Sequence, residues 1–331
     1  MPEELFEKIA DLHVVVVGDV MIDNYRWGDV ERISPEAPVP VVSIRRSENR
    51  LGGAANVALN CKALGAQVSM ASVIGNDEEG RSLVALLEEQ GIDTTLVQSS
   101  DARMTTAKTR ILSRNQQMIR LDSEMQEELN TRDEHAFIDA TLRFLQIRKP
   151  QILIFEDYNK GVLKENVIQK IIAHCQALGI VVAVDPKLRN FFAYKGVDIF
   201  KPNLKEVREG LHIPLEQVTE AGMEAVHRQL QEQLGHRISF ITLSEKGVYY
   251  HDETSGKVLP SHIRNIADVS GAGDTVIAVA AVVYALSRDA GLMAAYSNIA
   301  GGLVCEEVGV VPVNRDKLLA EIQRLLRDTV S

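Results

Sequence analysis

A short glycine-rich turn carries the residues best suited to chemistry. Gly271, Ala272 and Gly273 precede Asp274, and an apolar, helix-forming run over residues 276–286 follows directly. Small residues let a backbone approach a ligand closely, and the first N–H groups of a helix have no partner within it. These donors and the helix dipole favour an anion, so they could stabilise a phosphoryl group during its transfer. Asp274, in the first helical turn, could accept the proton of an attacking hydroxyl.

The turn also has a plainer interpretation. An acidic residue in the first turn of a helix is favourable in any protein, and glycine-rich loops are common. The turn lacks the third glycine of a G-x-G-x-x-G pattern, and the chain contains no G-x-x-x-x-G-K-[ST] segment. A nicotinamide-dependent dehydrogenase and a P-loop nucleoside triphosphatase are therefore disfavoured.

The elements that must position this turn alternate between strand and helix. Short apolar runs predict strands at residues 12–17, 68–74, 151–155, 180–184, 197–200 and 238–243. Several are continuously apolar, as in strands buried on both faces of a parallel sheet. Amphipathic segments predict helices at residues 54–64, 81–90, 164–178 and 223–234. This order predicts a doubly wound α/β fold with a mainly parallel sheet.

Two segments depart from the alternation. Residues 23–48, which contain Pro35, Pro38 and Pro40, and residues 105–122 have β-type patterns without helical partners. We expect both to form a small antiparallel β lid inserted into one domain that spans residues 1–331.

Composition narrows the classes of partner. The chain has 331 residues, of which 45% are hydrophobic, and a formal net charge of −10, so nucleic acid and anionic membrane surfaces are not expected partners. Its three cysteines form neither a disulfide framework nor a zinc-ligand spacing. The acidic N-terminus is unlike a signal peptide and no apolar run is long enough for a membrane span, so we expect a cytoplasmic protein.

Two glycine-rich segments together resemble the signatures of the ribokinase (PfkB) family of carbohydrate kinases. Residues 269–275 are similar to the C-terminal signature, and residues 52–58 (Gly-Gly-Ala-Ala-Asn-Val-Ala) are similar to the N-terminal one. The resemblance implies a ribokinase-like kinase domain that uses ATP and Mg²⁺, with K⁺ as a further candidate ion. It also implies that Gly271, Ala272 and Gly273 form an anion hole and that Asp274 is the catalytic base.

Longer segments, at residues 18–23, 32–41, 112–122 and 201–206, resemble the heptose 7-phosphate kinases of this family. The implied reaction is transfer of the ATP γ-phosphoryl group to the anomeric hydroxyl of D-glycero-D-manno-heptose 7-phosphate, a step toward ADP-heptose for lipopolysaccharide. The alternatives are a related kinase of another sugar or sugar phosphate and a catalytically silent sugar- or nucleotide-binding regulator. The intact turn with Asp274 argues against the silent protein.

Many relatives of this kind carry a second, nucleotidyltransferase domain. This chain reaches Ser331 soon after the last predicted core helix. Either a monofunctional kinase or the kinase part of a longer protein fits that observation.

The resemblance also implies contacts to the nucleotide and to ions. It places Asn203 and Glu206 near the ATP phosphates, with Glu206 holding water bound to Mg²⁺. The same pair has the spacing of a helix capping box, and the two roles are compatible. Ser244 and Gly247 occupy a turn that resembles the nucleotide-binding turn, although it could be an ordinary β-turn. Asp268 lies six residues before Asp274, where some relatives bind a monovalent cation.

The remaining candidates concern the sugar phosphate. Asp19 follows the first strand and could accept hydrogen bonds from sugar hydroxyls. The same role is predicted for Asp23, Gly52, Gly53 and Asn56, although close helix packing would also explain the last three.

A substrate that already bears a phosphate needs local cations in an acidic chain. Arg110, Arg114 and Arg120 of the predicted lid and Lys187 after a strand are the candidates, although lid arginines are often simply solvated. Arg110 and Arg114 would share a face if their segment were extended. The resemblance further implies a homodimer formed through the lid.

Overall fold

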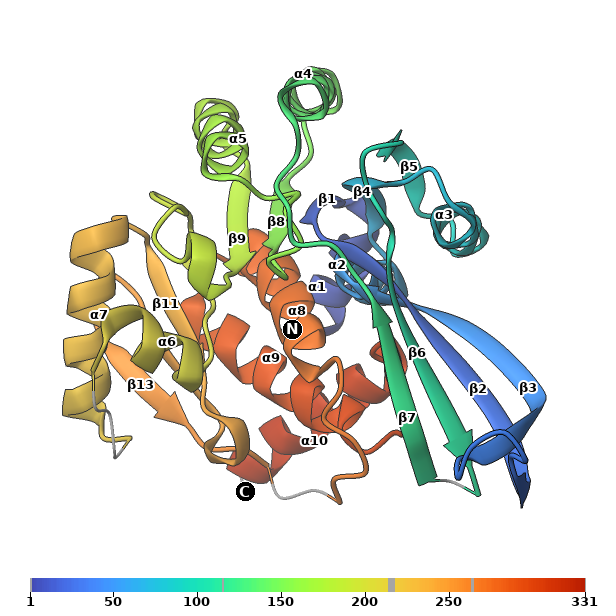
Figure 1. Cartoon of the computed structure of the whole chain (residues 1–331). Helices are drawn as coiled ribbons and strands as arrows, with labels where there is room; N and C mark the ends of the chain where they lie inside the picture. Colours follow the sequence, from blue (N-terminus) through green and yellow to red (C-terminus); the bar gives the residue numbers. More distant parts are fainter. Residues whose placement is uncertain (1, 115, 214–217, 263–264, 331) are drawn as a thin grey trace.

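A computed structural model describes residues 2–114, 116–213, 218–262 and 265–330 of the chain (Figure 1). Asn115, in the second predicted lid segment, lies outside these residues.

A large sheet forms the centre of the molecule (Figure 1). Among the described residues it has nine strands in the order β13-β12-β11-β10-β9-β8-β1-β4-β5. The strands from β11 to β5 pair in parallel, and β12 and β13 add an antiparallel edge. Their bounds are β1 His13–Gly18, β4 Gln67–Gly75, β5 Asp93–Ser100, β8 Ile152–Glu156, β9 Val181–Asp185, β10 Ile199–Phe200, β11 Ile238–Thr242, β12 Val248–His251 and β13 Gly256–Leu259. All six predicted core strands are present, and the doubly wound fold is confirmed.

Helices cover both faces of this sheet because its central strands are apolar on both sides. Val14 and Val16 of β1 pack into one hydrophobic cluster, whereas Val15 and Val17 pack into the other. The first cluster lies under α1 Pro2–Glu7, α2 Ala54–Leu64, α3 Glu78–Glu89, α8 Ala272–Ser287, α9 Ala290–Val304 and α10 Arg315–Val330. The second lies under α4 Thr131–Arg148, α5 Glu165–Leu178, α6 Leu204–Leu211 and α7 Glu220–Leu234.

Helix α8 is largely buried and carries the glycine-rich turn at its N-terminus. Every residue from Asp274 to Tyr284 is buried, which explains why this stretch is apolar without a polar face. The sheet lies on one side of α8, and α2 and α9 also pack against it. The turn is therefore fixed at the carboxyl edge of the sheet.

The predicted lid is present as a second, four-stranded sheet in the order β3-β2-β6-β7, which projects from the core (Figure 1). Its strands are β2 Val20–Ile33, β3 Pro40–Gly53, β6 Thr106–Ser113 and β7 Gln116–Ser123. Two antiparallel hairpins, β2–β3 and β6–β7, are joined by a parallel pairing of β2 with β6. Since β2 begins just after Asp19 and β3 ends at Gly53, the lid grows out of the edge that holds the turn.

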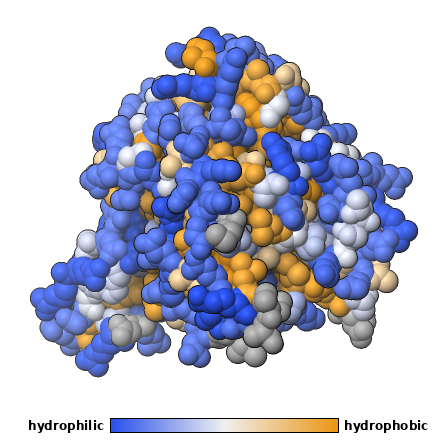
Figure 2. Space-filling model, turned by 180° about the vertical axis from the view of Figure 1, so that it is seen from behind, coloured by the Kyte–Doolittle hydropathy of each residue, from blue (hydrophilic) through white to orange (hydrophobic). Residues whose placement is uncertain are grey.

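Hydrophilic residues cover most of the face opposite to that of Figure 1, and hydrophobic residues gather mainly in its central part (Figure 2). None of the helices in the described ranges is both long and apolar enough to cross a membrane.

Candidate functional site

The glycine-rich turn places free backbone donors at the start of α8. Gly271 has a φ of 78°, a left-handed conformation that glycine adopts without strain. The N–H of Ala272 makes a long bond of 3.3 Å to the carbonyl of Val269. The N–H groups of Gly273 and Asp274 have no acceptor within the described ranges. These two donors suit an anion.

Asp274 is held by two side chains from other parts of the chain. Asn56 Nδ2 donates to Asp274 Oδ2 at 2.7 Å, and the Tyr158 hydroxyl donates to Oδ1 at 2.9 Å. Burial raises the pKa of Asp274 to about 6, although the two hydrogen bonds lower it. The charge of Asp185 also raises this pKa, and that of Lys201 lowers it. The carboxylate is thus ionised at neutral pH but more basic than an ordinary aspartate, as a general base requires.

A buried network fixes Asn56 relative to α8. The Asn60 side chain donates to the Asn56 carbonyl at 2.9 Å, and Asn60 Oδ1 accepts from the Thr275 hydroxyl at 2.9 Å. A Cβ on Gly271 would lie 2.9 Å from Asn56 Nδ2, so glycine is needed there for a second reason. The two family signatures therefore meet in space.

The sugar-site candidates of the lid lie next to this network. Arg110 Nη1 pairs with Asp23 Oδ1 at 2.5 Å, and both side chains are largely buried. A Cβ on Gly52 would lie 2.5 Å from Asp23 Oδ2, and Gly53, with a φ of 57°, would meet the Asp19 carbonyl at 2.6 Å. The glycines thus let the end of β3 pass close to Asp19 and Asp23.

Asp19 has its oxygens occupied by backbone donors. It is buried and accepts the N–H groups of Tyr158, Lys160 and Val162 at 2.9, 3.0 and 3.1 Å. Burial raises the pKa of Asp19, and these three hydrogen bonds oppose the shift. In this structure Asp19 holds the loop of residues 157–163; its predicted contact with the sugar stays a prediction.

The structure places two of the lid arginines, Arg110 and Arg120, on one face and Arg114 in a turn. Arg120 lies opposite Arg110 in the β6–β7 register and so on the same face, but it is half exposed and pairs with Asp122 at 2.8 Å. Arg114 lies in the turn after β6 with a φ of 49°, so the expectation that an extended segment would align it with Arg110 is wrong. Lys108, two residues before Arg110 in β6, was not predicted, yet its Nζ lies 5.9 Å from the centre of the Tyr158 ring.

The nucleotide-site candidates form a capping box that is also an ion-pair site. Asn203 Oδ1 accepts the N–H of Glu206 at 2.9 Å, and Glu206 Oε2 accepts the N–H of Asn203 at 2.8 Å. Glu206 Oε1 accepts from Lys187 Nζ at 2.7 Å. Lys187, predicted to bind the substrate phosphate, therefore lies beside the nucleotide candidates. Burial lowers its pKa, but Asp185 and Glu206 raise it well above its ordinary value and keep it charged.

A second buried cation lies beside the free amides of the turn. Lys201 is 2% exposed and pairs with Asp185 at 2.6 Å. A Cβ on Gly273 would lie 3.7 Å from Asp185 Oδ2 and 3.8 Å from Lys201 Nζ. Lys201 was missed as a candidate, although it lies in a segment, residues 201–206, that carries the resemblance.

Glu156, at the end of β8, was also missed. It is fully buried, and neither carboxyl oxygen has a partner within the described ranges. Burial raises its pKa well above the ordinary value, and the charges of Asp185 and Asp274 raise it further. Burial and these neighbouring charges therefore disfavour the ionised form of Glu156.

The remaining candidates lie in turns. Ser244 and Gly247, with φ of 56° and 96°, follow β11, whose Thr242 bridges to Asn203. Asp268 accepts the N–H groups of Ser270 and Gly309 at 2.9 and 3.0 Å, so it braces the turn that leads into α8. Burial alone would raise the pKa of Asp268, but the hydrogen bonds together outweigh it and lower the pKa below its ordinary value.

The described residues contain no group of three or more His, Cys, Asp or Glu side chains that could hold a metal ion. Single carboxylates, such as Glu206, suit a Mg²⁺ ion that keeps its waters and is carried by nucleotide phosphates. The donor set thus fits a metal that enters with the nucleotide.

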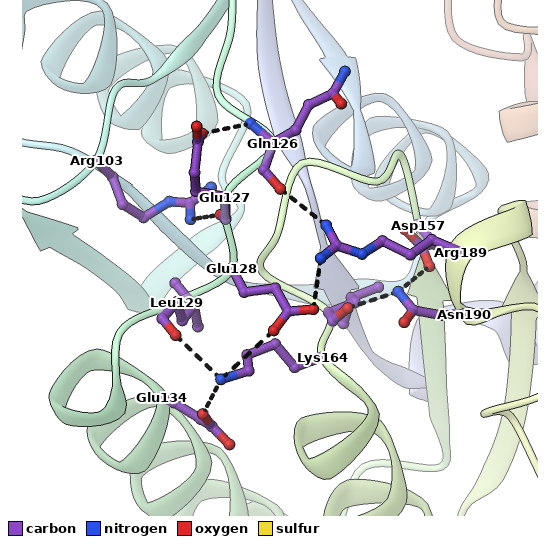
Figure 3. Close-up of polar contacts among 11 residues, drawn as sticks. Arg103, Gln126, Glu127, Glu128, Leu129, Glu134, Asp157, Lys164, Arg189 and Asn190 are labelled. Carbon is purple, nitrogen blue, oxygen red and sulfur yellow. Dashed lines mark hydrogen bonds and ion pairs between the residues drawn. The ribbon is translucent and has the colours of Figure 1, made fainter.

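A strap of residues 124–130, between β7 and α4, is held by the side chains of Arg103, Lys164 and Arg189 (Figure 3). Arg103 donates to the carbonyls of Glu127, at 3.1 Å, and Lys160. Lys164 Nζ donates to the Leu129 carbonyl at 3.2 Å, and Arg189 binds Glu128 at 2.9 Å. The strap therefore connects the lid to the loop of residues 157–163.

Comparison with known proteins agrees with this geometry. The model of the pfkB family of carbohydrate kinases matches residues 11–317. Two curated proteins called bifunctional protein HldE are similar: that of Methylobacillus flagellatus is 41% identical over 310 residues, and that of Geotalea uraniireducens is 37% identical over 321. The alignments cover 94% and 97% of this chain but 63% and 65% of those proteins. The chain thus spans less than two thirds of their length.

Solved structures show the same fold. Phosphofructokinase-2 from Escherichia coli in complex with potassium has a TM-score of 0.75 at 17% identity, covering 95% of this chain and 100% of that one. Arabidopsis thaliana ribokinase complexed with ribose and ATP has a TM-score of 0.69 at 19% identity, covering 93% and 98%. The extent of the family match and the identity to the curated relatives together show that the chain belongs to the pfkB family of carbohydrate kinases and is an ATP-dependent sugar kinase.

Proposed function

We propose that the chain transfers the γ-phosphoryl group of ATP to the anomeric hydroxyl of D-glycero-D-manno-heptose 7-phosphate. The observation that carries this proposal is the buried Asp274, held by Asn56 and Tyr158, beside the free N–H groups of its own turn. Four segments that resemble heptose 7-phosphate kinases, and relatives named HldE, support the choice of sugar.

Asp274 would accept the proton of the anomeric hydroxyl as that oxygen attacks. The N–H groups of Gly273 and Asp274, with Ala272 and Gly271 shaping the turn, would donate to the oxygens of the transferring group. Lys201, paired with Asp185 beside this turn, adds positive charge. Mg²⁺, when bound with ATP, would offset phosphate charge, with Glu206 holding one of its waters.

We place the sugar between the lid and the end of α8. Asp23 would accept hydrogen bonds from the sugar hydroxyls, and the Asn56 amide would donate to them. Gly52 and Gly53 leave room for a close approach. Asp19 would act chiefly through the loop that it holds. Closure of the lid would exclude water, which would otherwise accept the phosphoryl group.

We assign the substrate phosphate to the cations on the inner face of the lid. Arg110 and Lys108 are two residues apart in β6 and so lie on the same face. Arg110 pairs with Asp23, and Lys108 lies over the Tyr158 ring. Arg114 and Arg120, in the turn and on the half-exposed edge strand, would reach it only on lid closure. Lys187 would instead serve the nucleotide phosphates, because Glu206 and Asp185 hold it.

Two nucleotide and ion roles complete the proposal. Ser244 and Gly247, next to the Asn203 bridge, would contact the nucleotide. Asp268 would favour a monovalent cation next to the turn that it braces. Turnover in K⁺ compared with Na⁺ at equal ionic strength tests this last role, and equal rates would remove it.

We further propose a homodimer through the lid. Ile119 and Leu121 of β7 are 50% and 52% exposed and share the face opposite to that of Arg110 and Arg120. Ile111 lies opposite Ile119 on the same face. A second lid would cover these apolar side chains.

The decisive experiment is an ADP-release assay across sugars and sugar phosphates. Heptose 7-phosphate should give the highest kcat/KM, with phosphate transferred to the anomeric oxygen. A higher kcat/KM for another sugar would favour the related-kinase alternative, and ATP or sugar binding without ADP release would favour a silent regulator.

A further inference from the structure

Nothing in the sequence pattern marks Tyr158, yet its hydroxyl is one of two side-chain donors to Asp274. Tyr158 donates to Oδ1 at 2.9 Å and Asn56 to Oδ2 at 2.7 Å. The two donors come from different elements, the loop after β8 and the start of α2. One bond on each oxygen fixes the plane of the carboxylate and leaves lone pairs free for a substrate hydroxyl.

The position of Tyr158 is itself fixed by a buried carboxylate. Asp19 accepts the N–H of Tyr158 at 2.9 Å and two further N–H groups of the same loop. This loop is also tied to the strap of residues 124–130, because the N–H of Leu129 donates to the Gly161 carbonyl at 3.1 Å. The backbone that carries the Tyr158 side chain is therefore held at several points.

Cations from both sides of the site lie over the Tyr158 ring. Lys187 Nζ is 5.3 Å and Lys108 Nζ is 5.9 Å from its centre. Lys108 belongs to the lid, and Lys187 contacts the nucleotide candidate Glu206. Tyr158 thus lies where the proposed sugar, nucleotide and base sites meet.

We propose that Tyr158 is a positioning residue for the base, whose hydroxyl keeps Asp274 ionised and oriented toward the acceptor hydroxyl. The proposal rests on the proposed role of Asp274 in catalysis. It adds a donor that would act on the base rather than on the substrate.

The electrostatics of Asp274 give this bond a measurable consequence. Burial raises the pKa of Asp274 to about 6, and the hydrogen bond from Tyr158 is one of the contacts that limit the rise. The other titratable groups that face Asp274 are Glu156 of β8, Asp185 of β9 and Lys201 after β10, with Lys187 above the Tyr158 ring. Burial and the charge of Asp274 raise the pKa of Tyr158 well above its ordinary value, so the hydroxyl remains a donor at any working pH.

The test is the pH profile of single-turnover phosphoryl transfer in Tyr158→Phe. Loss of the donor should move the acid limb of the profile up by about one pH unit and slow transfer on that limb, below pH 6, by about tenfold. The KM for ATP should change little. A limb that stays at the wild-type pH, with a wild-type rate, would overturn the proposal.

Tyr194→Phe is a matched control. The Tyr194 hydroxyl also donates to a buried carboxylate, Asp157 Oδ2, at 2.7 Å, and burial raises the pKa of Asp157 to about 6 as well. This variant also loses a tyrosine hydrogen bond to a buried carboxylate, that of Asp157, the residue before Tyr158. It leaves the contacts of Asp274 unchanged. Its acid limb should match the wild type; an equal displacement in both variants would mean that loop packing, not the bond to the base, sets the profile.

A substitution that keeps the ring and hydroxyl covers the case in which Tyr158→Phe fails to fold. 3-Fluorotyrosine at position 158 has a more acidic hydroxyl and is a stronger donor, so the acid limb should move down. An unchanged limb would contradict the proposal. A failure of the proposed role of Asp274 would be seen in a different variant. It would appear as wild-type phosphoryl transfer by Asp274→Asn.

Discussion

Asn56 Nδ2 lies 2.7 Å from Asp274 Oδ2, and this buried hydrogen bond joins residues 218 positions apart in the chain. It connects the first turn of α2, which follows the lid strand β3, to the first turn of α8. The proposed base and the proposed sugar site are therefore joined directly. Substitution of either residue should therefore lower the rate of phosphoryl transfer more than the stability of the fold.

Asp274→Asn should stabilise the protein at alkaline pH. A carboxyl whose pKa is raised in the folded state favours folding below its unfolded pKa and costs stability as the pH rises through the folded value, here about 6. Removing the charge should raise the free energy of unfolding at pH 8 by roughly 1–3 kcal/mol, partly offset because an amide nitrogen cannot accept a hydrogen bond.

Chemical unfolding of this variant and the wild type at pH 8 and pH 4.5 measures the effect. The difference should shrink at the lower pH. Asp157→Asn is the control, because burial likewise raises the pKa of Asp157 to about 6. A variant that is less stable than the wild type at pH 8 and equal to it at pH 4.5 would show that the charge of Asp274 is favourable in the fold.

Glu206→Gln should weaken the response to Mg²⁺ more than it weakens the fold. The amide oxygen can still accept from Asn203, but the charge that pairs with Lys187 at 2.7 Å is lost. The Mg²⁺ concentration for half-maximal rate should rise about tenfold or more, whereas the melting temperature should change by only a few degrees. Asn203→Ser, which keeps a capping oxygen, separates the two roles. If Glu206→Gln unfolds easily yet has a normal Mg²⁺ response, its role is capping alone.

The inner-face cations should distinguish a phosphorylated sugar from its unphosphorylated form. Lys108→Met should lower kcat/KM for heptose 7-phosphate by about tenfold or more and leave that for heptose nearly unchanged, because only the first substrate offers an anion. Arg45→Gln is the control, since Arg45 is an exposed lid cation that pairs with Asp29 at 3.1 Å. Equal losses with both sugars would remove Lys108 from the phosphate site.

Charging the outer face of the lid should separate the proposed dimer. Ile119→Asp combined with Leu121→Asp would place two carboxylates in the interface, so the mass measured by sedimentation should fall from that of two chains to that of one. Ile147→Asp, at a 78% exposed position of α4 far from the lid in sequence, is the matched control and should leave the mass unchanged. A single-chain mass for the wild type would refute the dimer.

The centre of the large sheet was predictable because its strands, like residues 274–284 of α8, are buried. A residue such as Val15 of β1 has apolar neighbours in sequence, and the structure buries each of them on one face of the sheet or the other. The lid was predictable as well, since its segments have strand patterns without helices. The parallel pairing of β2 with β6 was not, because local pattern does not determine which strands become neighbours.

The site was predictable only where family signatures name it. Asp274 and Asn56 belong to the two signatures, whereas Tyr158 reaches Asp274 across 116 positions by a contact that depends on strand order. Lys187 was assigned to the substrate because it follows a strand end, but the sequence does not show that α6 presents Glu206 to it. The sequence predicts that Arg114 shares a face with Arg110, because residue spacing does not show that the chain turns at Arg114.

Single-turnover transfer by Asp274→Asn, with ATP and heptose 7-phosphate at saturating concentration, tests the central claim most directly. The change keeps the shape of the side chain and removes the proton acceptor, so the rate should fall by about 10²–10⁴, or roughly 3–5.5 kcal/mol of barrier. Calorimetry should find the affinity for ATP unchanged and that for the sugar phosphate only modestly weaker. A variant that transfers the phosphoryl group at the wild-type rate would contradict the assignment of Asp274 as the base.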